Sequence, residues 1–468
     1  MLSSIKKFIS LFLSALRGTD EEFTSGSIDR AIFLLAIPMI AEMILEAVFA
    51  VVDMYFVSKI SVNAVATVGL TESMMMLIYS VAIGMAMATT AIVARRIGAK
   101  ENKRAADAGF QAIFLATIAG VSIGIAGFLF SEELLYAMGG DDTMVHEGVG
   151  FTRIMFAGNI SIMLIFLINA IFRGAGDASI AMWSLSIANG LNIILDPLLI
   201  FGWGPIPAFG IDGAAMATVT GRSIGIIFQI YFLIRGTDRI RITAENIVIR
   251  MKTIWEIIRI STTGIWQFLV ETASWIFLIR IIAGFGMDAV AGYQIAFRVI
   301  VFTILPAWGL SNAAATLVGQ NLGAKSPERA ERSVWRTAQF TMIFLGLISV
   351  VFYFGAELVI GLFEAANVPS VLEIGTKGLK IICFGYLFFA YGMVITQAFN
   401  GAGDTKTPFF INFFVFWIFQ IPLAYYLSKE LGLNEIGVFV MIAVAHSVHA
   451  IVSVIIFRRG KWKLISVT

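Results

Sequence analysis

The chain alternates between long apolar segments and short polar ones. Each apolar segment runs for roughly 20 residues or more, and at ~1.5 Å of rise per residue such a segment spans a hydrocarbon core of ~30 Å as a helix. The pattern predicts twelve membrane-spanning helices, near residues 31–58, 66–94, 108–130, 149–172, 179–203, 211–234, 254–284, 293–317, 336–362, 376–399, 408–428 and 435–457. Barrel strands would be shorter and strictly alternating. The predicted fold class is therefore an all-α integral membrane protein.

Composition supports this prediction. Hydrophobic residues make up 59% of the 468 residues and charged residues only 14%, whereas soluble domains carry about 25% charged residues. The net charge of +2 and the single cysteine, Cys383, do not narrow the function further. We expect membrane lipids as partners and no nucleic acid.

The distribution of basic residues predicts the orientation. An even number of spans places both termini on one side. Most lysines and arginines fall on that side, in the termini and in the loops at 95–104, 235–252 and 325–336, whereas the opposite loop at 131–148 is acidic without Lys or Arg. Because cytoplasmic loops are enriched in Lys and Arg, both termini are expected to be cytoplasmic in a prokaryotic plasma membrane.

The N-terminal segment 1–24 resembles a signal peptide only superficially. Its apolar residues follow helical spacing, with Lys6 and Lys7 between them, and no clear small-x-small cleavage site follows. An uncleaved helix lying on the cytoplasmic interface is the preferred interpretation.

An internal repeat divides the chain. "RRIGAKENKRA" at 95–105 matches "GQNLGAKSPERA" at 319–330, and "FRGAGDASIAMW" from Phe172 matches "FNGAGDTKTPFF" from Phe399, at nearly the same offset along the chain. The repeat predicts two pseudo-symmetric six-helix bundles of one orientation around a central cavity, an architecture typical of transporters. The corresponding segments are an N-lobe at 25–234, a linker at 235–252, a C-lobe at 253–458 and a tail at 459–468.

Motifs for enzymatic chemistry are not found. Neither Gly-Ala-Gly-Asp segment has the spacing of a nucleotide loop or follows a strand, so we interpret both as tight turns in which Asp177 or Asp404 favours the next helix start. No His-Glu-x-x-His or cysteine nucleophile arrangement occurs, and the chain has three histidines. The sequence therefore predicts a protein that is not an enzyme and carries no cofactor.

Acidic and amide residues inside the spans form stripes. Glu42, Glu46 and Asp53 lie within an arc of ~40° on the first span, and Asn192 and Asp196 follow i, i+4 spacing on the fifth. An ionisable residue at membrane depth costs several kcal/mol, so it normally faces a bundle interior or a wet cavity. These stripes are expected to point inward.

The depth of the polar residues predicts which of them meet. Asp53, Asp196 and Thr218 each lie five to seven residues inside the outer ends of their spans, which is on the order of 10 Å at helical rise. They are expected to meet in the outer part of the N-lobe. Glu42 and Glu46 lie deeper.

The second half lacks most of these groups. At the repeat offset Asp53 pairs with Leu278 and Asp196 with Ile421, and Glu46 alone keeps an acidic counterpart, Glu271. This asymmetry favours an ion site in the N-lobe, although a buried aspartate that fixes helix packing is an alternative. Candidates for the substrate or a secondary polar site are Glu42, Glu46, Gln267, Glu271 and Met75.

In these residues and in the motifs around them, the chain resembles the MATE (multidrug and toxic compound extrusion) transporters, in particular their DinF-like branch. The resemblance covers nearly the whole chain after residue 30 and lies in "AIPMI", "VVDMYFVSKISVNAVATVGL", "FRGAGD", "LNIILDP", "GIDGAAMAT" and the second "GAGDT". It implies two lobes around a cavity and antiport of organic, often cationic, compounds against H⁺ or Na⁺.

The resemblance also implies site residues. The ion-coupling site, or a Na⁺ site, would comprise Asp53, Asn192, Asp196 and Thr218, with Asn169 from the fourth span. Asn169 lies closer to the cytoplasmic end than the others by the depth count. Carboxylate, amide and hydroxyl oxygens suit Na⁺ and a proton network equally, so the coupling ion stays open. We expect a monomer.

A flippase for lipids or lipid-linked saccharides is the competing function. Such a protein has a related helical layout, but its cavity would need several cations for a pyrophosphate group, and Arg222 is the only well-buried candidate in the sequence.

Overall fold

The computed structural model describes residues 2–19 and 21–467, with side chains from Ile9 onward. Residues 1, 20 and 468, which fall within the expected N-terminal segment and C-terminal tail, lie outside the described residues. Regular structure in the described part is helical, apart from an isolated bridge between Trp203 and Ile206.

The predicted fold class is confirmed. In the part of the chain that the structure describes, eleven helices are long and apolar enough to cross a membrane, and a bent pair of shorter helices supplies a twelfth span. The N-terminal helix α1 (Leu2–Arg17) precedes these spans.

The N-lobe contains the first six spans. They are α2 (Ile28–Val57), α3 (Val62–Gly98), α4 (Asn102–Leu129), α6 with α7 (Asp142–Ala157 and Asn159–Ala175), α8 (Ala178–Phe201) and α9 (Ile211–Arg235). The acidic segment expected to be a loop instead contains a short helix, α5 (Ser131–Ala137), and about the first two turns of α6. A linker with the 3₁₀ turn η1 (Ala244–Asn246) leads to the second half.

The C-lobe repeats this order. Its spans are α10 (Met251–Ala283), α11 (Met287–Gly323), α12 (Pro327–Ile360), α13 with α14 (Pro369–Phe384 and Tyr386–Ala402), the segment from α15 (Lys406–Asn412) through η3 (Phe413–Gln420), α16 (Ile421–Tyr425) and η4 (Tyr426–Glu430), and α17 (Asn434–Arg458). The 3₁₀ turns η2 (Glu364–Asn367) and η5 (Lys461–Leu464) lie before α13 and after α17. The eleventh span is π-helical in η3 and η4.

The fourth span of each lobe is interrupted at corresponding glycines. Gly158 separates α6 from α7, and Gly385 separates α13 from α14, where the axis bends by 58°. Both fourth spans end on a left-handed glycine, Gly176 with φ 94° and Gly403 with φ 84°. A residue without Cβ adopts this conformation at no steric cost, which is why the Gly-Ala-Gly-Asp turns stop both helices.

The two turn aspartates act differently. Asp404 accepts a hydrogen bond from the backbone N–H of Thr407 at 3.1 Å, as expected of a residue that caps the next helix. Asp177 instead accepts from the Thr237 hydroxyl at 2.6 Å and pairs with Arg239 at 3.3 Å. It therefore ties the N-lobe to the start of the linker.

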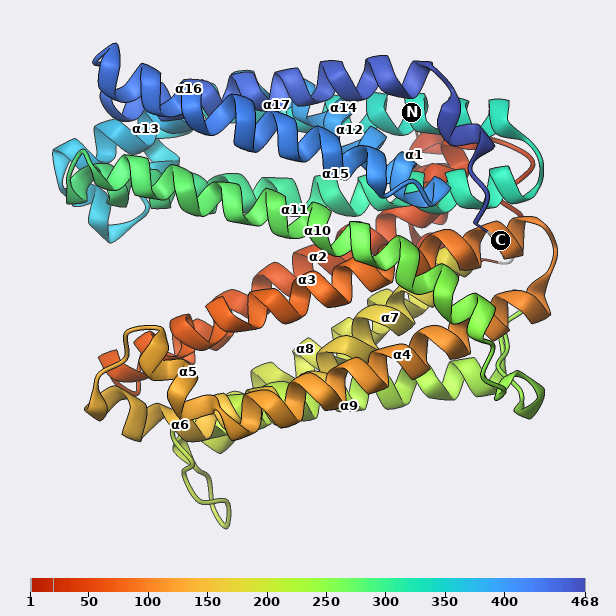
Figure 1. Cartoon of the computed structure of the whole chain (residues 1–468), viewed down its shortest axis with the longest axis horizontal. Coiled ribbons are helices and arrows are strands. Elements are labelled where there is room, and N and C mark those ends of the chain that lie inside the picture. Colours follow the sequence, from red (N-terminus) through yellow and green to blue (C-terminus); the bar gives the residue numbers. More distant parts are fainter. Residues whose placement is uncertain (1, 20, 468) are drawn as a thin grey trace.

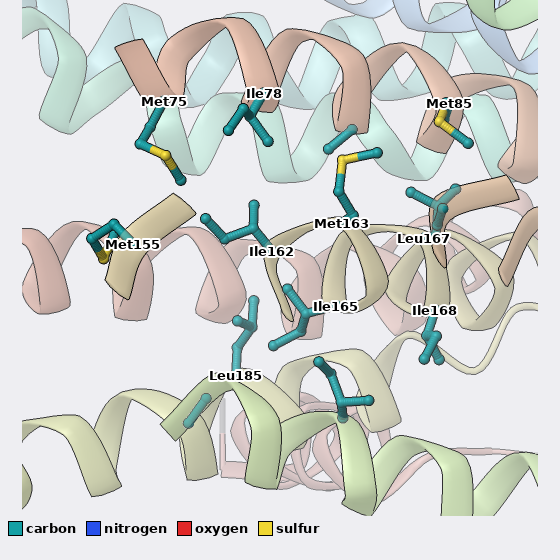
Figure 2. Close-up of a cluster of buried hydrophobic side chains, with 14 of the residues drawn as sticks. Met75, Ile78, Met85, Met155, Ile162, Met163, Ile165, Leu167, Ile168 and Leu185 are labelled. Carbon is teal, nitrogen blue, oxygen red and sulfur yellow. The ribbon is translucent and has the colours of Figure 1, made fainter. Parts of the chain in front are cut away.

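Each lobe has its own apolar core. In the N-lobe, α7 lies between α3 and α8, and its side chains pack against Met75, Ile78 and Met85 of α3 and Leu185 of α8 (Figure 2). In the C-lobe, two buried clusters are centred on α11, α14 and α17. The burial of both faces of α7 and α14 explains why these spans are apolar on nearly every side.

The lobes meet at one end of the molecule. They come together at the end that holds both termini and diverge toward the opposite end (Figure 1). The first half of α2 packs on α11, and the first half of α10 packs on α3. The first span of each lobe therefore begins against the other lobe and continues into its own.

Candidate functional site

A cavity lies between the two lobes. Its N-lobe wall includes Glu46 of α2 together with Phe166 and Arg173 of α7. Its C-lobe wall includes Trp308 of α11 and Asn400 of α14. Aromatic rings, amides, one carboxylate and one guanidinium thus surround a space at the base of the diverging lobes. Such a mixture of apolar and convergent polar groups is typical of sites for small organic molecules.

The polar stripe of α8 lies inside the N-lobe, as its spacing predicted. Asn192 donates one hydrogen bond to Asp196 Oδ1 and another to the Thr218 hydroxyl of α9, each at 3.2 Å. Asp196 has no exposed surface. The second oxygen of Asp196 and the amide oxygen of Asn192 accept no hydrogen bond from the described residues. Two buried acceptors therefore remain available at this point.

Asp53 of α2 completes this group. It is partly exposed, and its carboxylate is close enough to that of Asp196 for the two charges to act on each other. Glu72 of α3 and Arg222 of α9 also act on Asp53 electrostatically. We refer to Asp53, Asn192, Asp196 and Thr218 as the aspartate cluster. The structure brings these four residues together from three helices.

Glu46 lies between the aspartate cluster and the cavity. Its carboxylate is 3.8 Å from the Arg222 guanidinium, and its side chain is 34% exposed. Arg222 is buried, donates to the Tyr79 hydroxyl at 3.2 Å and lies over the ring of Phe49. Since a guanidinium stays charged in proteins, Arg222 provides a fixed cation beside two acids of α2.

Asn169 belongs to a different cluster. It donates to Glu42 Oε1 at 3.2 Å and accepts a short hydrogen bond from Gln229 of α9. Arg173 pairs with the same Glu42 oxygen at 3.0 Å. These four residues form the Glu42 cluster, which lies nearer the terminus end than the aspartate cluster. The structure therefore does not bring Asn169 to Asp196, in line with its depth in the sequence.

Sequence reasoning missed two members of the Glu42 cluster. Arg173 stands in the "FRGAGD" motif, which we interpreted only as a turn. Gln229 follows Arg222 by about two helical turns and Thr218 by about three, so all three share one face of α9. Extending the helical spacing of Thr218 and Arg222 along the sixth span toward the linker would have found Gln229.

A polar cluster surrounds Glu271 in the C-lobe. Asn412 donates to Glu271 at 3.1 Å, and its amide oxygen lies 3.0 Å from His449 Nε2. Gln267 is buried one turn before Glu271, and its amide oxygen has no partner among the described residues. Asn412 and His449 were not predicted as partners of Glu271, because contacts between distant spans leave no trace in spacing.

The counterparts of the aspartate cluster in the C-lobe are apolar or structural. Leu278 is fully buried in the C-lobe core. Ile421 packs against the same core, and Trp417, the counterpart of Asn192, donates to the Val270 carbonyl at 2.8 Å. The asymmetry noted in the sequence thus corresponds to packed side chains in three dimensions.

Met75 lies outside the cavity. It is buried in the N-lobe core between α3 and α7 (Figure 2). The methionines of the cavity wall are Met43 and Met87. The methionine-rich second span therefore reaches the cavity through Met87, about three helical turns closer to the terminus end than Met75.

Within residues 2–19 and 21–467, no group of three or more His, Cys, Asp or Glu side chains is arranged to hold a metal ion. A sodium ion at the aspartate cluster would depend on amide and hydroxyl oxygens as well as carboxylates. These are ligands that hard cations accept.

Comparison with known families identifies the chain. The MatE family profile matches residues 38–198 and 265–426, one segment in each lobe. The chain belongs to the MatE family. Its members are transporters and not enzymes, and multidrug efflux is the function associated with them. Family membership does not favour the flippase alternative.

Individual MatE proteins resemble the chain over most of its length. It is 26% identical to the "Probable multidrug resistance protein NorM" of Thermotoga maritima, over 93% of both chains. A crystal structure of MATE in complex with MaL6 has a TM-score of 0.89 at 26% identity and covers 96% of this chain and 100% of that one. The outward-facing conformation of a multidrug resistance MATE transporter of the MOP superfamily gives 0.88 at 26% identity, with 95% and 98% covered.

Proposed function

We propose that this protein is an ion-coupled exporter of organic compounds, often cations, and that the aspartate cluster of the N-lobe is its coupling site. One observation carries the proposal. Two membrane-embedded aspartates from α2 and α8 interact electrostatically, and one of them is fully buried with an unpartnered oxygen. Holding both charges in a site of low polarity is costly unless a cation neutralises them.

Ion binding and substrate binding share helix α2. This helix carries Asp53 at the ion site and Glu46 at the cavity wall, and its first half packs on α11 of the other lobe. Protons, or a Na⁺ ion, that bind at Asp53 and Asp196 reduce the negative charge of this pair and so change the packing preference of α2. Because α2 also borders the cavity, the ion biases the equilibrium between the two access states, which is what coupling requires.

The cavity wall favours organic compounds with an apolar body and a positive group. Phe166 and Trp308 offer ring surfaces, and the partly exposed Glu46 carboxylate is in place to contact a cation. Cation–π attraction by the rings adds to this preference. Neither H⁺ nor Na⁺ is favoured over the other by the ligand set.

A transport assay in liposomes tests this function directly. Liposomes that contain the purified protein are loaded with a fluorescent organic cation, and dye efflux is followed under a pH gradient alone and under a Na⁺ gradient alone. We expect at least one gradient to drive dye movement against its concentration difference, and the effective gradient identifies the ion. Efflux that ignores both gradients, or movement of labelled lipid instead of dye, would contradict the proposal.

The proposed orientation has both termini in the cytoplasm of a prokaryotic cell. In a Cys383→Ala background, single cysteines replace the exposed residues Glu133, at the end opposite the termini, and Glu328, at the terminus end. We expect a membrane-impermeant maleimide to label position 133 in intact cells and position 328 only after lysis, because the basic loops stay inside. The reversed labelling pattern would place the termini outside.

A further inference from the structure

Glycines that recur in the internal repeat lie in the contact between the two lobes, at the end where the lobes meet. Gly84 and Gly309 are counterparts in the repeat, and so are Gly98 and Gly323 at the same offset. In each case the glycine contacts the other half of the molecule so closely that a Cβ atom would collide with backbone. These repeated glycines therefore mark positions where the two lobes are in close contact.

Gly98 and Gly323, the pair nearer the terminus end, are related by the pseudo-two-fold axis between the lobes. A Cβ on Gly98 would lie 1.9 Å from the carbonyl oxygen of Gln320, and a Cβ on Gly323 would lie 2.0 Å from that of Arg95. Arg95 and Gln320 are themselves counterparts at the offset that relates the two glycines. The last turns of α3 and α11 thus cross each other backbone to backbone, and only glycine permits this approach.

The inner pair shows the same symmetry. A Cβ on Gly84 of α3 would lie 2.5 Å from the backbone nitrogen of Ile265 of α10. A Cβ on Gly309 of α11 would lie 2.6 Å from the carbonyl oxygen of Met39 of α2. Each second span therefore presses against the first span of the other lobe as well as against the other second span.

Arg95 and Gln320 also form corresponding hydrogen bonds. The carbonyls at the end of a helix lack partners within that helix. Gln320 donates to the carbonyl of Gly174, near the end of α7, at 3.0 Å, and Arg95 donates to the carbonyl of Ala402, at the end of α14, at 3.5 Å. Each lobe thus uses a side chain of its second span to satisfy the end of the other lobe's fourth span.

The tail adds a contact on one side only. Arg95 donates to the carbonyl of Ile465 at 2.6 Å, which is the shorter of its two bonds. Val467 is buried beside Gly403 and Ile260, in the same apolar cluster as the N-lobe core. The tail therefore reinforces the contact between the lobes where Arg95, the longer-reaching donor, bridges them.

These contacts form the floor of the cavity. Thr316 lines the cavity and donates to the carbonyl of Arg173 at 3.0 Å, and Gly401 lines it while its backbone packs on Ala315. Beyond them toward the termini come the Gln320 bond and the Gly98–Gly323 crossing. Any path from the cavity to the terminus end must part these residues.

We propose that Gly98, Gly323, Arg95 and Gln320 constitute a two-fold related gate that closes the terminus end of the cavity and opens in each transport cycle. The proposal rests on the alternating access of the proposed function. The hydrogen bonds from Arg95 and Gln320 to the helix ends suit reversible closure. When the gate opens, water can replace each side-chain donor at little net cost in free energy. The close glycine packing, in contrast, exists only in the closed state.

Distances between spin labels test the gate by a readout that is independent of transport activity. In a Cys383→Ala background, one pair of cysteines replaces Asn102 and Glu328, which begin the helices after the crossing at the terminus end. A second pair replaces Val62 and Met287, which begin α3 and α11 at the opposite end. All four positions are exposed.

The Gly98→Ala and Gly323→Ala variants are expected to shift both distributions. The terminus-end pair should move apart and the opposite pair should move closer, with the ratio of open to closed populations changing by about tenfold or more. Gly69→Ala is the matched control, because Gly69 lies on the same helix α3 and a Cβ there meets nothing within 4 Å. Distributions equal to those of Gly69→Ala would overturn the gate.

A second variant guards against misfolding of the glycine variants. Gln320→Met keeps the length of the side chain and removes the donor to α7. We expect a shift in the same direction but smaller, and an unchanged distribution would contradict the role of Gln320. Ion-driven efflux of each protein is measured in parallel. Wild-type protein that fails to transport refutes the proposed function, whereas glycine variants whose label distances match the control refute the gate.

Discussion

Asp196→Asn is expected to reduce ion-driven dye efflux to the level of liposomes without protein. Asparagine fills the same space and still accepts from Asn192, but it carries no charge for a proton or Na⁺ to neutralise. The two access states then no longer differ in ion affinity, and without differential affinity the gradient cannot bias them. Asp53→Asn is expected to have the same effect, since the two charges act on each other. The measurement is dye efflux under separately imposed pH and Na⁺ gradients.

Two further carboxylates serve as controls for this result. Glu133→Gln neutralises an exposed acid on α5 and should leave coupled efflux unchanged. Glu271→Gln neutralises the acid of the C-lobe cluster and should retain coupling, because the N-lobe alone holds the paired aspartates. Dye binding to the Asp196→Asn protein should persist, which would separate loss of coupling from loss of the cavity. Coupled efflux that survives both aspartate substitutions would refute the coupling site.

Glu256→Leu is expected to destabilise the folded protein by about 3–5 kcal/mol, the cost of leaving a buried charge without its partner. Glu256 of α10 pairs with Arg96 of α3 at 3.1 Å, and the two side chains are 9% and 4% exposed. The guanidinium cannot lose its proton, so the carboxylate is what compensates it. The remaining bonds, from Arg96 to the Arg104 carbonyl at 2.7 Å and to the Thr253 hydroxyl at 3.5 Å, offer only neutral acceptors. Thermal unfolding of the purified protein in detergent measures the effect.

The matched controls distinguish a buried pair from an exposed one. Arg96→Met combined with Glu256→Leu removes both charges and should recover most of the lost stability, because apolar replacements of a buried ion pair are often tolerated. Glu245→Gln breaks the exposed pair with Lys103 and should leave the unfolding temperature unchanged, since solvent screens such pairs. A double variant as unstable as Glu256→Leu alone would show that packing, and not charge pairing, holds α3 to α10.

Twelve spans and two lobes were predictable because their signals are local or repetitive. A segment that crosses a hydrocarbon core can be recognised by its length and its apolar composition. The repeat can be recognised by matching segments such as the Gly-Ala-Lys of both halves. The aspartate cluster was also predictable. Its members lie at similar depth, and helical spacing turns them to the inside of one bundle. The bent fourth span of the C-lobe and the π-helical stretch in the eleventh carried no comparable signal.

The separation of Asn169 from Asp196 shows where such prediction ends. Depth alone indicated that Asn169 was closer to the terminus end, but its partners Glu42 and Gln229 come from the first and sixth spans. The same holds for Glu271, which meets Asn412 and His449 from spans far along the chain. Hydrophobic patterns determine which face of a helix is buried, and they contain no information on which neighbour covers it.

The sequence by itself therefore determined the membrane class, the number of spans, the duplication and the inward direction of the acids, because each depends on short-range spacing or on transfer from water to lipid. Tertiary structure alone decided the partners of each buried polar group, the position of Met75 in the core and the contacts that the repeated glycines make between the lobes. These depend on close approach between helices that lie far apart along the chain, and the packing of two whole lobes against each other sets that approach.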